Sequence, residues 1–272
     1  MLPNFIVIGA MRAGTTSLAR YLTRNNDVYM APVKEVHFFD RSFDKGLGWY
    51  QDHFLSGPQH SAVGEATPNY VHDKLAMERI AQTIPDVKLL MLLRNPVDRA
   101  YSHYWHNRSR AKESLSFEEA IAEEPKRLST SDADRTIYSY VDRGRYLDQL
   151  RRVLTLFPRD SLDVFLYEDL RDDTAGTLKK IWTSLGCDLS HTDWDQPFER
   201  FNAYVEFRSV RVRRLARDWG GPVGRVVGRL NAVKSVEYPP MRSATRRELE
   251  SLFSTANHGL GQEFGLDTSV WA

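Results

Sequence analysis

The stretch FIVIGAMRAGTTSLARYL, residues 5–22, combines a short apolar run, a glycine-containing loop and a segment with helical periodicity. The apolar residues 5–8 end at Gly9, as expected of a buried parallel strand. Apolar side chains then recur every third or fourth residue from about Ser17, which indicates a helix. A strand, a tight loop and a helix in this order are typical of a phosphate-binding corner in α/β proteins.

The loop is close to the G-x-x-x-x-G-K-[ST] pattern of proteins that bind nucleoside triphosphates, with one departure. Gly9 and Gly14 have the required spacing, but Thr15 stands where the pattern has lysine. That lysine contacts the β- and γ-phosphates, so its absence argues against triphosphate chemistry. An anion cradle remains, because the N–H groups at a helix N-terminus favour negative charge. Arg12 adds a cation to this loop.

Two further apolar runs, VKLLMLL at residues 87–93 and LDVFLY at residues 162–167, also indicate buried strands. A helical segment follows each of them, so strands and helices alternate along the chain. The alternation predicts an α/β class: a three-layer fold like that of P-loop NTPases, with a central parallel sheet flanked by helices. No domain boundary is evident, so residues 1–272 are expected to form one domain. The polar segment 109–135 is expected to be a helix and a mobile loop.

The composition is ordinary for a globular protein, with 42% hydrophobic and 27% charged residues. A net charge of +1 lacks the basic field that nucleic-acid-binding proteins carry, so no nucleic-acid partner is expected. The single cysteine, Cys187, excludes a disulfide framework, and the histidines show no metal-ligand spacing, so no metal is expected. No signal peptide or run of about 18 apolar residues is present, which favours a cytoplasmic protein without a transmembrane segment.

The opening loop resembles the 5′-phosphosulfate loop of sulfotransferases that use 3′-phosphoadenosine 5′-phosphosulfate (PAPS). In that family the loop commonly reads K-x-G-T-[ST], and here it reads RAGTTS, so arginine replaces the usual lysine. Arginine keeps the positive charge but is a planar fork with more donors. The resemblance implies that the cofactor-binding residues of this loop are Arg12, Ala13, Gly14, Thr15, Thr16 and Ser17.

The segment LLRNPVDRAYSHY, residues 92–104, resembles the 3′-phosphate motif of the same family, R-[DN]-P-x-x-R-x-x-S-x-[YF]. The resemblance implies that Arg94 and Ser102 bind the 3′-phosphate, which is the group that distinguishes PAPS from ATP. A guanidinium and a hydroxyl form a suitable phosphate clamp. Arg99 is interpreted as a structural brace.

The segment PVKEVHFFD, residues 32–40, resembles the K-E-x-H-[FY]-F segment of glycosaminoglycan-type sulfotransferases and their bacterial relatives. The resemblance implies that Glu35 is the general base that removes the proton of the acceptor hydroxyl. His37 is the rival base, because the phenol and steroid sulfotransferases use a histidine. If Glu35 is the base, His37 is expected to orient it.

Two weaker matches complete the resemblance. The segment GEATPNYV, residues 64–71, lies where relatives have E-K-[ST]-x-x-Y, so Ala66 replaces a lysine that assists catalysis. Glu65 is interpreted as an acceptor-site residue or a second carboxylate. The segment KSVEYPPM, residues 234–241, retains only the first basic residue of the family's K-G-R-K-x-P-x-M loop, and Lys234 is expected to contact the nucleotide.

The sequence therefore predicts a PAPS-dependent sulfotransferase that acts on a hydroxyl of a glycan, a glycolipid or a small-molecule natural product, with Glu35, Arg12 and His37 as catalytic residues. A P-loop nucleotide kinase or NTPase is the first alternative, with Glu168-Asp169 as its acidic metal ligands. A non-catalytic nucleotide-binding module is the second. The arginine-rich segment 206–230 either contacts an anionic acceptor or forms a solvated helix face.

Overall fold

The computed structural model describes residues 1–195, 198, 205–207, 212, 232–234 and 239–271. The chain divides into two compact units. The first unit comprises Met1–Asn95, Arg145–Phe201 and Thr255–Ala272, and the second comprises Pro96–Gly144 and Asn202–Ser254. This division does not test whether residues 1–272 form one domain, so the single domain expected from the sequence stays a prediction.

A five-stranded sheet forms the centre of the first unit, and all of its strand pairs are parallel. The strand order is β2-β3-β1-β4-β5, so the chain first builds the sheet on one side of β1 and then on the other. The strands are β1 (Phe5–Gly9), β2 (Val28–Met30), β3 (Ala62–Ala66), β4 (Lys88–Leu93) and β5 (Leu162–Leu166).

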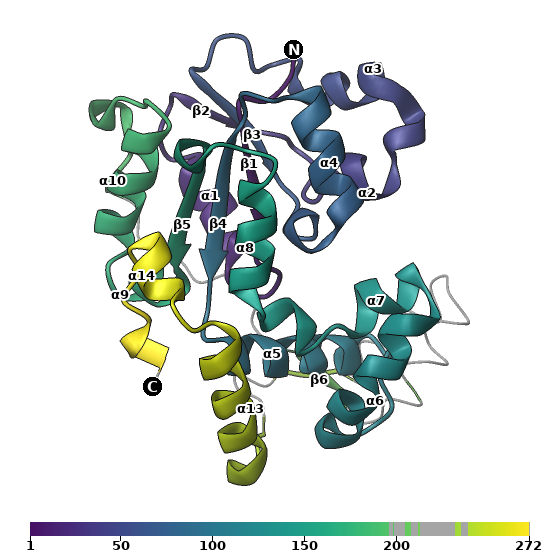
Figure 1. Ribbon diagram of the computed structural model, residues 1–272. Coiled ribbons are helices and arrows are strands. Elements are labelled where there is room, and N and C mark those ends of the chain that lie inside the picture. The colour runs from purple at the N-terminus through teal and green to yellow at the C-terminus, as the bar shows by residue number, and fades with distance from the viewer. Residues whose placement is uncertain (196–197, 199–204, 208–211, 213–231, 235–238, 272) are drawn as a thin grey trace. The chain divides into compact units, whose positions relative to one another are not determined.

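Helices cover both faces of this sheet, which confirms the predicted α/β fold (Figure 1). Alternate residues of β1 enter different cores: Phe5 packs on one face and Ile6 on the other. The helices α1 (Thr15–Leu22) and α10 (Thr174–Ser184) cover the Phe5 face. The opposite face is covered by α2 (Phe38–Arg41), α3 (Gly46–Gln51), α4 (Lys74–Thr83), α8 (Tyr146–Leu154) and α14 (Leu260–Phe264). A further short helix, α9 (Tyr167–Asp172), follows β5 directly.

The second unit is mainly helical and has its own core, which includes Val97, Tyr104, Phe117 and Phe253. Its helices are α5 (Pro96–Ser109), α6 (Phe117–Thr130), α7 (Asp132–Tyr138) and α13 (Ser243–Ala256). Two short strands, β6 (Val205–Phe207) and β7 (Ala232–Lys234), pair in antiparallel fashion.

The segment 109–135, expected to be a helix and a mobile loop, begins with the non-helical residues 110–116 and continues into two helices, α6 and α7, which meet at Ser131. Ser116 and Glu119 form a capping box that starts α6. Ser131 then caps α7, and its side chain accepts a hydrogen bond from the amide of Asp134. The polar side chain of Ser131 therefore marks the start of a second helix within this segment.

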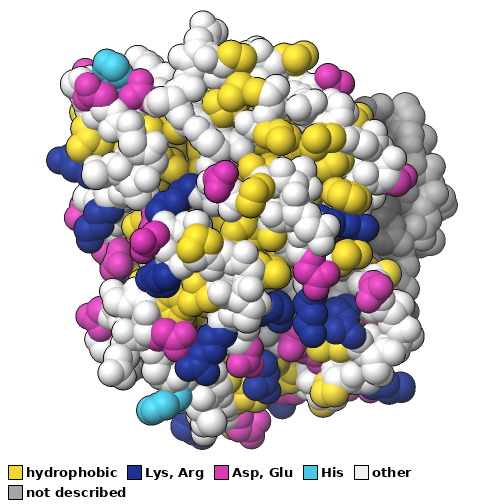
Figure 2. Space-filling model, turned by 45° about the horizontal axis from the view of Figure 1, so that its top comes forward, with side chains coloured by type: hydrophobic (Ala, Val, Ile, Leu, Met, Phe, Trp, Pro, Cys, Tyr) yellow, Lys and Arg dark blue, Asp and Glu magenta, His cyan; other side chains and the backbone are white. Residues whose placement is uncertain are grey.

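Basic and acidic side chains are intermingled on the face drawn in Figure 2, in keeping with the net charge of +1. Large apolar side chains are also exposed, among them Leu55 and Leu75. Within the part of the chain that the structure describes, no helix has the length and apolar character needed to cross a membrane. The cytoplasmic location expected from the sequence stays a prediction.

Candidate active site

The predicted site residues of the first unit lie at one edge of the sheet, where its parallel strands end. Ligands of open parallel sheets bind outside the carboxyl ends of the strands, close to the point where the strand order reverses. That point is β1 in this sheet. The residues that follow the strand ends are Arg12 after β1, Glu35 after β2, Thr67 after β3, Arg94 after β4 and Tyr167 after β5.

The loop between β1 and α1 has the shape of an anion cradle. The amide of Ala10 donates to the carbonyl of Leu92 at 2.8 Å, which ties the loop to β4. Gly14 precedes α1 with a φ of 89°, and a Cβ built on it would lie 2.7 Å from the ring of Tyr167. The amide groups in the first turn of a helix have no partner within the helix, so they are suited to bind an anion. The contacts of this loop with a nucleotide stay a prediction.

Substitution of Gly14 by alanine should therefore destabilise the protein more than the same substitution at Gly186. Both glycines have positive φ, which costs an alanine about 1–2 kcal/mol. Only Gly14 also faces a ring, and that overpacking should add about 1–3 kcal/mol. Urea denaturation of the two variants measures the difference. Equal free energies of unfolding would contradict the close fit of the loop against Tyr167.

Arg94, in the segment 92–104, contacts the loop between β1 and α1. Its Nη1 atom donates to the carbonyl of Arg12 at 3.3 Å, and its guanidinium carbon lies 5.1 Å from the centroid of the Tyr167 ring. Its own carbonyl accepts a hydrogen bond from the hydroxyl of Tyr146 at 2.8 Å. The arginine predicted to bind the 3′-phosphate thus contacts the phosphate loop itself.

The other predicted nucleotide contacts belong to the second unit. Ser102 is a buried residue of α5, and Arg99, on the same helix, donates to the carbonyl of Tyr140, in keeping with a structural role. The backbone of Lys234 is in β7, but its side chain lies outside the described residues. Most of the arginine-rich segment 206–230 lies outside them as well.

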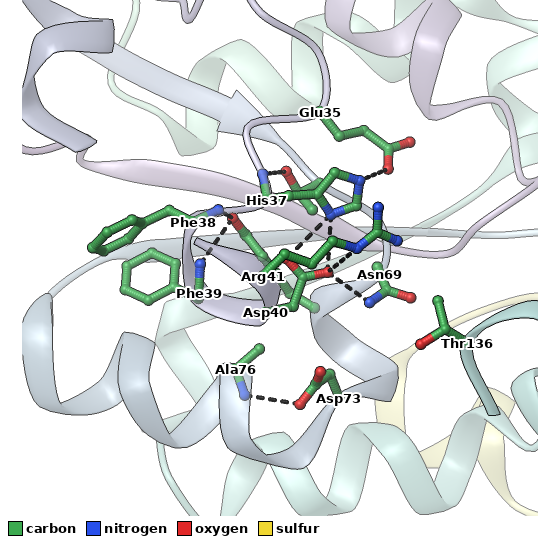
Figure 3. Close-up of polar contacts among 12 residues, drawn as sticks. Glu35, His37, Phe38, Phe39, Asp40, Arg41, Asn69, Asp73, Ala76 and Thr136 are labelled. Atoms are coloured by element: carbon green, nitrogen blue, oxygen red, sulfur yellow. Dashed lines mark hydrogen bonds and ion pairs between the residues drawn. The ribbon is translucent and has the colours of Figure 1, made fainter. Parts of the chain in front are cut away.

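Three side chains of the 35–40 segment form a chain of charged contacts (Figure 3). The Nε2 atom of His37 lies 3.0 Å from a carboxylate oxygen of Glu35, and its Nδ1 atom lies 2.9 Å from Oδ2 of Asp40. Asn69 donates to the same Asp40 oxygen at 2.7 Å. Lys34 places its Nζ atom 3.7 Å from the other oxygen of Glu35. About a third of the Glu35 side chain is exposed, whereas that of Asp40 is almost fully buried.

These contacts fix the charge states at neutral pH. Burial opposes the charged form of His37, but hydrogen bonds to Asp40 and Glu35 outweigh it and raise the pKa of His37 to about 9. Burial likewise opposes ionisation of Glu35, but the hydrogen bond to His37 and the charge of Lys34 lower the pKa of its carboxyl. An imidazolium has no lone pair to accept a proton, whereas an ionised carboxylate such as that of Glu35 can accept one.

The raised pKa of His37 predicts how stability changes with pH. Because the folded-state pKa of about 9 exceeds the ordinary 6.5, the stabilisation is complete below pH 6.5 and is lost as the pH rises through 9. Relative to His37→Gln, the wild type should lose up to about 3 kcal/mol over this range. Denaturation at each pH, with an NMR titration of the imidazole, measures both quantities. A constant stability difference, or a pKa near 6.5, would contradict the charged contacts.

Sequence reasoning gave no role to Asp40 and Asn69, whose side chains contact each other next to His37. The His37–Asp40 spacing of three residues was a usable signal, since such residues share one face of a helix. Glu65 was interpreted as an acceptor-site residue or a second carboxylate, and its side chain is fully buried, which argues against direct contact with the acceptor. Ala66, which stands where relatives have a lysine, is buried at the end of β3 and carries no charge. The lysine that does lie beside Glu35 is Lys34.

The first of the two acidic residues named for the kinase alternative, Glu168, has structural partners. One carboxylate oxygen of Glu168 accepts a hydrogen bond from the amide of Asn95 at 3.0 Å. The other oxygen accepts one from the indole of Trp271, also at 3.0 Å. Glu168 therefore joins the end of β4 to the C-terminal segment of the chain.

A parallel sheet with a glycine loop after its central strand and a partly exposed glutamate at the same edge places the protein among α/β proteins with a site suited to an anionic ligand. The sequence family described as "Sulfotransferase domain" matches residues 2–218. The chain therefore belongs to the sulfotransferase family, which confirms the predicted family and overturns the kinase alternative.

Similar proteins agree with this membership. The chain is 30% identical to human bifunctional heparan sulfate N-deacetylase/N-sulfotransferase 3, over 96% of the chain and 30% of that protein. It is 30% identical to mouse heparan sulfate glucosamine 3-O-sulfotransferase 3A1, over 98% of the chain and 65% of the relative. The human 3-O-sulfotransferase 6 is 32% identical, over 97% and 73%. The chain thus spans less than two thirds of the first two relatives.

Solved structures resemble the chain as well. A sulfotransferase from Alicyclobacillus acidocaldarius superposes with a TM-score of 0.74 at 27% identity, covering 100% of this chain and 99% of that one. Mouse sulfotransferase SULT7A1, solved in complex with PAP, has a TM-score of 0.52 at 13% identity, over 99% and 86% of the two chains. The second likeness shows the fold alone.

Proposed function

We propose that the protein transfers a sulfuryl group from PAPS to a hydroxyl of its acceptor, with Glu35 as the general base. The observation that carries this proposal is the state of Glu35. Its carboxylate is partly exposed, ionised at neutral pH and held by His37 at the carboxyl edge of the sheet. The family membership supports sulfuryl transfer, and the loop after β1 supports a phosphate-bearing donor.

In the proposed reaction, Glu35 accepts the proton of the acceptor hydroxyl while that oxygen forms a bond to sulfur. The bond between sulfur and the 5′-phosphate oxygen breaks, and the nucleotide keeps the bonding electrons. PAPS supplies the activated sulfuryl group. Arg12 and the first amides of α1 stabilise the negative charge that develops on the leaving oxygen, which is the kind of electrostatic stabilisation expected to contribute most.

His37 and Asp40 keep Glu35 in position for this proton transfer. The imidazolium bridges the two carboxylates, and the buried Asp40 is itself fixed by the amide of Asn69. A carboxylate held in this way loses little freedom when the acceptor binds, which favours a reactive geometry. His37 thus takes the orienting role that the sequence left open.

We assign the donor's 3′-phosphate to Arg94 and Ser102, and a further contact to Lys234. The position of Arg94 supports its part, because its guanidinium lies against the carbonyl of Arg12 in the phosphate loop. A nucleotide with phosphate groups on both the 3′ and the 5′ oxygens of its ribose can therefore contact the loop and Arg94 together. The donor PAPS carries a phosphate at each of these two positions.

The acceptor proposed is the hydroxyl of a sugar in a glycan or glycolipid, or of a small natural product. Relatives named as heparan sulfate glucosamine 3-O-sulfotransferases support a sugar hydroxyl. The test uses PAPS with a radiolabelled sulfuryl group, a metal chelator and a panel of heparan oligosaccharides, glycolipids and phenols. Labelled sugar and an equal amount of released PAP are expected. Nucleotide binding without transfer to any acceptor would instead favour a non-catalytic module.

A further inference from the structure

A buried cluster of hydroxyl groups surrounds Glu65 next to the segment that carries the candidate base. The side chain of Glu65 has no exposed surface. The phenols of Tyr50 and Tyr70 both donate to its Oε1 atom at 3.0 Å. The hydroxyl of Thr67 donates to its Oε2 atom at 2.6 Å. A carboxylate can only accept hydrogen bonds, so it determines where these three hydroxyl protons point.

Two of these hydroxyls also accept hydrogen bonds from the backbone of residues 37–39. The oxygen of Tyr70 accepts from the amide of Phe38 at 2.9 Å and from that of Phe39 at 3.5 Å. The oxygen of Thr67 accepts from the amide of His37 at 3.4 Å. A hydroxyl whose only proton is given to Glu65 presents its lone pairs to these amides.

The amides concerned are those at the start of α2, where the helix itself offers no acceptor. His37 precedes this helix with a φ of 55°, a left-handed conformation that residues other than glycine seldom adopt. The imidazole of His37 then reaches Glu35 on one side and Asp40 on the other. The hydroxyl oxygens therefore hold the backbone of residues 37–39, and the imidazole of His37 on this backbone contacts Glu35.

We propose that Glu65 is a positioning residue for the transfer reaction, and that it acts through Thr67 and Tyr70 to hold the backbone at residues 37–39. This inference rests on the proposed function of Glu35. The ring of Tyr50 packs on those of Phe38 and Phe39, with centroids 4.5 and 5.1 Å apart, and this packing is kept when the hydroxyl is removed. Among its hydrogen bonds in the described structure, none joins Tyr50 to residues 37–39.

Protonation of Glu65 should weaken this arrangement. Burial raises the pKa of its carboxyl to about 7, although the hydrogen bonds from its three hydroxyl partners oppose the rise. The ionisable groups that face it are Tyr50 on α3, Tyr70 after β3, Asp40 on α2 and Lys34. Once protonated, Glu65 becomes a donor, and a hydroxyl that turns to accept this proton no longer donates to the carboxyl.

The chain offers a matched pair of variants for the test. Tyr50→Phe and Tyr70→Phe each remove one buried hydroxyl that donates to the same oxygen of Glu65 at 3.0 Å. Only Tyr70→Phe also removes an oxygen that accepts a hydrogen bond from the amide of Phe38. Tyr70→Phe should lower kcat on the order of tenfold to a hundredfold, with the affinity for PAP unchanged. Tyr50→Phe should lower kcat much less than Tyr70→Phe, because it removes only a hydrogen bond to Glu65. Equal losses in both variants would overturn the proposal.

A second measurement does not depend on transfer. The NMR titration of His37 should give a pKa near 9 in the wild type and in Tyr50→Phe, and a lower value in Tyr70→Phe. If the wild type transfers no sulfuryl group, the proposed function fails, and this titration still decides whether Tyr70 positions His37. An unchanged titration in Tyr70→Phe would overturn the positioning role whatever the activity.

Thr67 provides variants in case Tyr70→Phe does not fold. Thr67→Val keeps the shape of the side chain and removes its hydroxyl, whereas Thr67→Ser keeps the hydroxyl. Thr67→Val should lower both kcat and the pKa of His37, and Thr67→Ser should restore them. Equal behaviour of the two variants would show that the packing of the side chain matters and not the hydrogen bond, which would contradict the proposal.

Discussion

Replacement of Glu35 by glutamine should lower kcat by about 10²–10⁴-fold, the loss expected when a positioned general base is removed. Glutamine has nearly the same shape as glutamate, but its amide cannot take up the proton of the acceptor. The affinity for PAP should be unchanged, because no role in binding the nucleotide is assigned to Glu35. Steady-state kinetics and calorimetry on the same preparation measure the two quantities.

Glu78→Gln is the matched control, since Glu78 is an exposed residue of α4 and should tolerate the same change without effect on kcat. The pH dependence gives a further check. The lowered pKa of Glu35 keeps it ionised down to its ordinary value of 4.5, so kcat/KM should show no loss from this group above that pH. Wild-type activity in Glu35→Gln, together with inactivity of His37→Ala, would assign the base to His37.

Replacement of Arg94 by alanine should weaken the binding of PAP by about 10- to 100-fold, as expected for the loss of a charge-assisted hydrogen bond. The affinity for adenosine 5′-phosphosulfate, which has no 3′-phosphate, should change much less. The difference between the two nucleotides separates the loss of a phosphate contact from a general disturbance of the loop that Arg94 touches. Competition calorimetry measures both affinities.

Two variants control for charge and for folding. Arg94→Lys keeps the charge but not the planar fork, so it should recover only part of the affinity. Arg151→Ala removes an exposed arginine that pairs with Glu263 on the same unit, and it should bind PAP like the wild type. An equal loss of affinity for both nucleotides in Arg94→Ala would contradict a specific role in binding the 3′-phosphate.

The elements that the sequence predicted well are those with continuous apolar runs. Residues of β1 and β4 are almost all buried, and such strands carry little besides large apolar side chains. The glycine loop and the helix after it followed from local rules for backbone conformation and helix ends. The strand predicted at residues 162–167 ends at Leu166 in the structure, where α9 begins.

The strands β2 and β3 escaped prediction because their sequences lack this signature. The first has only three residues. The second reads AVGEA, with a glycine whose missing side chain leaves room for the ring of Phe5 and a glutamate that is buried among hydroxyl groups. A fully buried carboxylate is uncommon, so the sequence favoured an acceptor-site residue or a second carboxylate for Glu65 and not a buried one. Of its partners, Thr67 and Tyr70 follow it closely in the sequence, whereas Tyr50 becomes adjacent only in the folded chain.

We propose above all that this protein recognises the 3′-phosphate of its nucleotide donor. We also propose that it binds this nucleotide without magnesium, unlike a site for ATP. Calorimetry of the wild type with PAP, adenosine 5′-phosphate and ATP, each in the presence and absence of magnesium, tests this claim most directly. We predict that PAP binds most tightly of the three and that its affinity is independent of magnesium. Tighter binding of ATP, dependent on magnesium, would contradict the assignment of Arg94 and of the phosphate loop to a PAPS site.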